Sequence, residues 1–88
     1  MKHKEGFILR RVGEKHIVLP ISEAARDLGA ALQLNESGAL LWGLLDSDCA
    51  LETLAHALTQ NFDIDGETAV RDTAAFLAKL RGNGLLIE

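Results

Sequence analysis

The sequence predicts a small α+β domain in which three N-terminal strands are followed by three helices. Three observations predict this order. The first part of the chain, up to Pro20, is rich in Phe, Ile, Leu and Val and is interrupted by one Gly-Glu pair. From Asn35 onward the apolar residues recur with helical spacing, and Gly82-Asn83-Gly84 near the end is a typical helix stop. With 88 residues, 48% of them apolar, the chain fits one compact domain over residues 1–88.

The first two strands are expected within Gly6 to Pro20, on either side of a tight turn at Gly13-Glu14. Glycine supplies any positive φ that such a turn requires. Proline donates no ladder hydrogen bond, so Pro20 marks the end of the second strand or an edge position. On this strand two faces alternate, one with Ile17, Leu19 and Ile21, the other with His16, Val18 and Pro20. The side chain of His16 is expected to be exposed.

The next segment, Ser22 to Gly29, is compatible with one helical turn or with a loop. A third short strand is predicted over Ala30 to Leu34, because Asn35 stops it. This strand contains no proline and no charge, so at a sheet edge its unpaired N–H and C=O groups offer a template for an added peptide strand. The alternative is that a loop or the C-terminal tail covers this edge.

Three amphipathic helices are expected after Asn35. The first covers Glu36 to Leu45, with Asn35 or Ser37 as its N-cap and Trp42 in the core. The second carries apolar residues at helical spacing, namely Leu51, Leu54, Ala55, Leu58 and Phe62. The third covers about Gly66 to Arg81 after the cap Asp65, and it is expected to bury some of Val70, Ala74, Leu77 and Leu80. Leu85-Leu86-Ile87 then packs on the core or adds a strand.

The charge distribution argues against nucleic acid or an anionic membrane as the main partner. The net charge is −4, although residues 1–20 hold five basic and two acidic side chains, a local excess of +3. The longest apolar run, Gly38 to Leu45, is far shorter than the roughly 20 residues that span a bilayer. The single Cys49 excludes an internal disulfide. These features favour a cytoplasmic protein.

No catalytic or metal-binding constellation is found in the sequence. Cys49 and His56 lie about 10.5 Å apart if they share one helix, which is too far for a nucleophile and its base. The three histidines form no i,i+4 pair, and the acidic residues cluster at helix starts and turns, where capping explains them. A binding module that needs no cofactor is therefore a better hypothesis than an enzyme.

Strands combined with three helices are also compatible with a winged helix-turn-helix, whose third helix would enter the DNA major groove. That helix carries three basic residues (Arg71, Lys79 and Arg81) against three acidic ones (Asp65, Glu67 and Asp72), so it is neutral overall. A winged-helix DNA-binding regulator is accordingly the second hypothesis. A third is a small subunit whose apolar edge assembles with itself or with a larger partner.

The run Leu34-Asn35-Glu36-Ser37-Gly38-Ala39-Leu40-Leu41-Trp42-Gly43-Leu44-Leu45 resembles the core motif of the PqqD-like family. These small proteins are named after the D component of pyrroloquinoline quinone (PQQ) biosynthesis and are also called RiPP recognition elements. Further matches are Gly6-Phe7, Ile17-Val18-Leu19-Pro20, Asn61-Phe62-Asp63-Ile64-Asp65, Phe76-Leu77, Leu80 and Gly84-Leu85-Leu86. The chain departs from the family pattern at Ser47 and at Asp48-Cys49-Ala50, which affects only the predicted cap of the second helix. The resemblance is to the stand-alone form of the family.

This resemblance implies a winged helix-turn-helix-like fold that binds the leader segment of a ribosomally made precursor peptide. The leader adds as a strand to the third strand and lies against the third helix, and a modifying enzyme, often a radical S-adenosylmethionine protein, then acts on the core peptide. Carried over by position, the strand residues are Ala31, Leu32, Gln33 and Leu34, and the helix residues are Val70, Arg71, Ala74 and Leu77, with neighbours such as Lys79. The expected partners are the leader and the enzyme, without nucleic acid or membrane; a homodimer through an edge strand is a further option.

Overall fold

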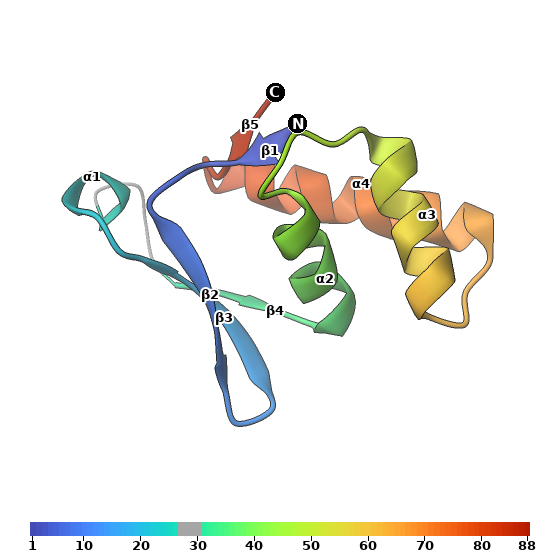
Figure 1. The fold of residues 1–88 in the computed structure, drawn as a ribbon, viewed down its shortest axis with the longest axis horizontal. Coiled ribbons are helices and arrows are strands. Elements are labelled where there is room, and N and C mark those ends of the chain that lie inside the picture. Colours follow the sequence, from blue (N-terminus) through green and yellow to red (C-terminus); the bar gives the residue numbers. More distant parts are fainter. Residues whose placement is uncertain (27–30) are drawn as a thin grey trace.

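The computed structural model describes residues 1–26 and 31–88, and it confirms an α+β fold with N-terminal strands followed by three long helices (Figure 1). The elements, in chain order, are β1 (Lys2–His3), β2 (Phe7–Val12), β3 (Lys15–Pro20), α1 (Glu23–Arg26), β4 (Leu32–Leu34), α2 (Glu36–Leu44), α3 (Leu51–Asn61), α4 (Gly66–Gly82) and β5 (Leu86–Ile87). In Figure 1 the β2–β3 hairpin projects away from the helices, and the two termini lie close together.

The main sheet has the antiparallel order β2-β3-β4, so β4 lies at one edge. The predicted turn at Gly13-Glu14 joins β2 to β3. Gly13 has a φ of 65° and no described residue other than glycine has a positive φ, which fits a type II′ turn with glycine at its first central position. The edge strand is shorter than predicted, because Ala31 precedes it and Ala30 lies outside the described residues.

One face of this sheet packs against the helices. Val18 and Leu34 are buried on that face, and Leu34 lies opposite His16 in the ladder. His16 therefore points toward the helices, and its side chain is only 13% exposed. The expectation that His16 is exposed was wrong, because the alternation of the strand places it on the same face as Val18.

The segment after β3 contains one helical turn, α1, over Glu23–Arg26, so the helical alternative holds for these residues. The hydroxyl of Ser22 accepts a hydrogen bond from the Ala25 N–H at 3.1 Å and caps this turn. Gly6, with a φ of 92°, lies directly against it, since a β-carbon at Gly6 would lie 2.7 Å from the Ser22 Oγ. The remainder of the predicted segment, up to Gly29, includes positions outside the described residues.

α2 and α4 begin and end within one residue of their predicted bounds, and α3 contains the predicted residues Leu51, Leu54, Ala55 and Leu58, while Phe62 follows its end. α2 is capped by Asn35, and Asp65 caps α4 by accepting a hydrogen bond from the Thr68 N–H at 2.7 Å, which holds the pKa of its carboxyl below the usual range. The N-cap of α3 is Ala50, which makes no side-chain hydrogen bond. This agrees with the departure from the family pattern at that point.

The core lies between the sheet and the helices, with Leu41, Trp42 and Leu45 at its centre. The buried face of α4 consists of Ala69, Thr73, Leu77 and Leu80. Some of Val70, Ala74, Leu77 and Leu80 were expected to be buried, and this is confirmed for Leu77 and Leu80, whereas Val70 and Ala74 are exposed. α4 is rich in alanine, and small apolar residues on several faces made the rotation of the helix ambiguous in the sequence.

The C-terminal end of α4 explains how the tail returns to the core. Gly84 has a φ of 70° and donates to the Arg81 carbonyl, while the Leu85 N–H donates to the Leu80 carbonyl at 2.9 Å. This pair of bonds is a Schellman motif. It turns Leu85 into the core and directs β5 alongside β1, so the strand alternative for the tail is confirmed.

Candidate functional site

A groove of about 540 Å³ lies between the edge strand β4, the start of α2 and one face of α4. Two of its lining residues, Leu41 and Leu58, are fully buried and belong to the core. The remaining lining residues are Gln33, Leu34, Asn35, Ser37, Gly38, Asp72, Ala75, Phe76 and Lys79. Its walls are thus a strand edge with main-chain groups, a helix start and a helix face.

The main-chain groups of Gln33 point into this groove. The Lys79 ammonium donates a hydrogen bond to the Gln33 carbonyl oxygen at 3.2 Å, so this oxygen faces α4 rather than β3. In an antiparallel ladder the N–H and C=O of one residue point to the same side, so Ile17 and Gln33 form a non-hydrogen-bonded pair. Both main-chain groups of Gln33 are therefore directed toward an additional strand.

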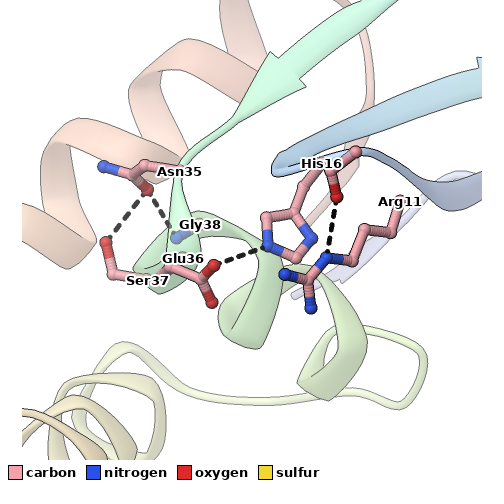
Figure 2. A network of polar contacts seen from close by, with 7 residues as sticks. Arg11, His16, Asn35, Glu36, Ser37 and Gly38 are labelled. Atoms are coloured by element: carbon pink, nitrogen blue, oxygen red, sulfur yellow. Dashed lines mark hydrogen bonds and ion pairs between the residues drawn. The ribbon is translucent and has the colours of Figure 1, made fainter.

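The start of α2 forms a rigid end of the groove (Figure 2). The Asn35 Oδ1 accepts hydrogen bonds from the Gly38 N–H at 2.8 Å and from the Ser37 hydroxyl at 3.0 Å. Gly38 is closely surrounded, since a β-carbon there would lie 3.2 Å from Phe76 and 3.3 Å from Leu34. The absence of a side chain at Gly38 lets α2, β4 and α4 approach one another.

Behind this end, a hydrogen bond between two side chains joins β3 to α2. The His16 Nε2 lies 3.0 Å from the Glu36 Oε1, and Figure 2 shows the two side chains facing each other. The hydrogen bond to His16, together with its charge, holds the pKa of the Glu36 carboxyl below its usual range. This pair fixes the α2 start, which carries Asn35 and Gly38, relative to the sheet.

The α4 side of the groove is a single stripe at spacing i, i+3, i+4, i+7, made of Asp72, Ala75, Phe76 and Lys79. It lies next to the buried stripe of the same helix. Ala75 leaves room above the helix, and the half-buried Phe76 ring provides apolar surface. Asp72 and Lys79 place opposite charges two turns apart, about 10.5 Å along the helix axis.

A family model described as "Coenzyme PQQ synthesis protein D (PqqD)" matches residues 7–86. The chain belongs to this family. Among curated proteins, no relative matches this chain.

Two solved structures share the fold. One is described as TbiB1 in complex with the TbiA(beta) leader peptide; it has a TM-score of 0.76 and 23% identity and covers 98% of this chain and 94% of its own. The other is described as lasso peptide synthetase B1 complexed with the leader peptide, with the same TM-score and identity, covering 99% and 96%. The agreement over nearly the full length of both chains supports the winged-helix-like architecture.

The structure brings together some of the residues that the family resemblance implied. Gln33, Leu34 and Lys79 line the groove, and Leu32 lies in the same strand with its side chain half-buried. Ala31 is exposed just before β4. On α4, Leu77 is buried in the core, whereas Val70, Arg71 and Ala74 are exposed and do not line the groove.

The sequence reasoning missed Asp72, Ala75 and Phe76 as groove residues. Their signal was present, because together with Lys79 they follow helical spacing on one face. This spacing was not used, because apolar Val70 and Ala74 were expected to form the peptide-binding face of the helix. The offset of Phe76 from the core stripe was the clearest indication, since a large aromatic beside a buried stripe lies at the edge of the core.

Residues that suggested other chemistry lie apart from one another. The Cys49 thiol donates to the Leu44 carbonyl oxygen at 3.1 Å, and His56 is exposed on α3. Across residues 1–26 and 31–88, no group of three or more His, Cys, Asp or Glu side chains is placed to hold a metal ion. In the same ranges, no helix has the length and apolar character needed to cross a membrane.

Proposed function

We propose that this protein is a non-enzymatic module that binds the leader segment of a ribosomally made precursor peptide and presents the precursor to a modifying enzyme. The observation that carries the proposal is the edge of β4, where Gln33 directs its main-chain groups into a groove beside α4. A strand edge that faces a groove is suited to peptide binding by strand addition, in which main-chain hydrogen bonds provide the affinity.

The family and the fold support this proposal. The chain belongs to a family described by its role in coenzyme PQQ synthesis, and it shares its fold with two proteins solved with leader peptides. The modifying enzyme is expected to be one such as a radical S-adenosylmethionine enzyme. We place this step in the cytoplasm, where ribosomally made precursors are released.

We assign distinct roles to the two sides of the groove. On the strand side, Gln33 supplies the main-chain donor and acceptor, Ala31 continues the same edge, and Leu32 and Leu34 hold β4 against the core. On the helix side, Ala75 and Phe76 receive alternate side chains of the peptide. Of the helix residues first carried over, Leu77 supports α4 from within the core, and Val70, Arg71 and Ala74 flank the contact.

The test uses decapeptides selected from a random display library on the parent protein. Gln33→Pro removes the outward N–H without removing a bond to β3, and Ala75→Glu places a charged side chain in the groove. Gln33→Pro is expected to weaken binding at least fivefold, since loss of a buried polar partner costs about 1–3 kcal/mol. Ala75→Glu is expected to weaken binding at least as much, because it would bury an unpaired carboxylate against the peptide. Ala74→Glu makes the same substitution one residue away on an exposed face and should leave the affinity within about twofold, as should Arg71→Ala.

Circular dichroism of each variant shows that a loss of binding is not a loss of fold. Selected peptides that bind folded Gln33→Pro and Ala75→Glu as tightly as the parent would place the peptide elsewhere and reject the proposal. If a second copy of the chain occupies the edge instead, Gln33→Pro will change the oligomeric state while peptide affinity stays constant. Sedimentation velocity separates these results.

A further inference from the structure

Lys79 is the cationic residue at the strand edge. Its ammonium reaches across from α4 to the Gln33 carbonyl oxygen at 3.2 Å, the acceptor that an added strand would use. Within the described part of the chain, Lys79 forms no salt bridge, although the other two basic residues of α4 do: Arg71 pairs with Glu67, and Arg81 pairs with Glu88. The charge of Lys79 is thus directed at the groove.

From this contact, and resting on the proposed function, we propose that Lys79 forms a subsite for one acidic side chain of the bound peptide. When a peptide strand adds to β4, its N–H donates to the Gln33 carbonyl, which has two lone pairs and can also keep the bond to Lys79. An ammonium has three donors, so Lys79 retains at least two for a carboxylate next to the strand. The carboxylate would lie next to the peptide residue whose N–H is bound to the Gln33 carbonyl oxygen.

The opposite end of the same stripe limits the charge that the groove accepts. Asp72 lines the groove about two turns before Lys79, and no described cation lies within salt-bridge distance of its carboxylate. An acidic side chain is attracted at the Lys79 end and repelled at the Asp72 end. The groove therefore selects an acidic residue at one position of the peptide rather than a uniformly acidic peptide.

Selection from a random decapeptide library tests this subsite. On the parent, we expect Asp or Glu to be enriched at one position of the aligned peptides. On Lys79→Glu, that position should change to Lys or Arg, because the sign of the subsite is reversed. Arg71→Glu is the matched control: it makes the same charge change on the same helix, at an exposed residue outside the groove, and it should leave the enriched position acidic.

A double-mutant cycle is completed by measuring the affinities of one selected peptide and of its acid-to-Lys variant for the parent protein and for Lys79→Glu. Lys79→Ala should weaken the acidic peptide about fivefold, as for an exposed ion pair of about 1 kcal/mol. Lys79→Glu should weaken it at least tenfold, and the acid-to-Lys peptide should recover most of that loss. Lys79→Arg should bind within about threefold of the parent.

The result separates this inference from the proposed function. Two outcomes would overturn the subsite and leave strand addition intact, provided that Gln33→Pro still abolishes binding. In one, the selected peptides show no acidic preference; in the other, the acidic preference persists on Lys79→Glu. Peptides that are unaffected by Gln33→Pro would overturn the proposed function itself. An acidic preference that Arg71→Glu abolishes as strongly as Lys79→Glu would show a general charge effect and would also overturn the subsite.

Discussion

At the residue scale, Trp42 joins the helical core to the N-terminal segment. It is 3% exposed, and its ring stacks on the His3 ring with centroids 4.2 Å apart and planes within 1°. His3 in turn lies 3.6 Å from Asp46, just after α2. One side chain therefore fills the core and also holds β1 in place, which makes its loss costly in two ways.

We predict that Trp42→Ala lowers the free energy of unfolding by about 3–5 kcal/mol, the usual cost of removing a large buried aromatic. A small domain has about 5–15 kcal/mol in total, so the variant will be partly or fully unfolded near 37 °C. Thermal denaturation followed by circular dichroism measures the effect, and Trp42→Phe should lose less because it fills part of the cavity. A melting temperature equal to that of the parent would contradict the buried position of Trp42.

The hydrogen bond between His16 and Glu36 predicts a pH dependence. The pKa of Glu36 is lower in the folded than in the unfolded chain, so the folded state favours the ionised carboxylate. This stabilisation is present above the ordinary pKa of glutamate and is lost as pH falls through the lowered value. We expect Glu36→Gln to melt below the parent at neutral pH and to converge with it at strongly acidic pH.

The control for this titration is Glu52→Gln, which removes an exposed glutamate from the first turn of α3. A general effect of removing one carboxylate from the first turn of a helix appears in both variants, so the contact between His16 and Glu36 accounts for the difference between them. Melting curves at several pH values test this, and a difference between Glu36→Gln and the parent that grows toward acidic pH would have the wrong sign for the proposed pair.

At the element scale, α2 contains two glycines in contrasting surroundings. A β-carbon at Gly38 would lie 3.1 Å from the Asn35 Oδ1 and 3.2 Å from Phe76, whereas one at Gly43 would meet nothing within 4 Å. Replacing a helical glycine with alanine gains about 0.5–1 kcal/mol when space allows. Alanine substitutions at the two positions therefore distinguish the effect of helix propensity on stability from the effect of packing around the groove.

We predict that Gly43→Ala stabilises the protein by about 0.5–1 kcal/mol and leaves peptide binding unchanged. Gly38→Ala should give no net gain, because the new methyl group pushes Phe76 and the Asn35 cap apart, and it should weaken peptide binding. Chemical denaturation and peptide titration of both variants measure these effects. Equal stabilisation by the two substitutions, with unchanged peptide affinity, would show that Gly38 does not shape the groove.

The elements also show how far the sequence determines the site. The hairpin, the caps Asn35 and Asp65, and the apolar spacing of α3 follow from local rules, because turns, caps and helical spacing depend on neighbouring residues. The rotation of α4 about its axis depends on which of its residues pack in the core, and the sequence left open which of Val70, Ala74, Leu77 and Leu80 do so. In the structure, the core residues of α4 are Ala69, Thr73, Leu77 and Leu80. The face of α4 that lines the groove is therefore made of Asp72, Ala75, Phe76 and Lys79.

At the scale of the whole molecule, the charge distribution opposes binding to DNA. The net charge is −4, and two of the three basic side chains of α4 are paired with carboxylates. A winged-helix regulator would need these cations for phosphates. We predict that the protein does not retain duplex DNA at physiological salt, whereas peptide binding by strand addition changes little with salt. Sub-micromolar DNA binding that weakens steeply with salt would favour the regulator instead.

Hydrogen exchange at the Gln33 amide, measured with and without a saturating selected peptide, tests directly whether the peptide adds as a strand to β4. Strand addition pairs the outward Gln33 N–H with a peptide carbonyl, so its exchange should slow by at least tenfold in the complex. Amides on the exposed face of α3, such as that of His56, should exchange at the same rate in both states. A saturated complex in which the Gln33 amide exchanges as fast as in the unbound protein would contradict peptide addition at β4.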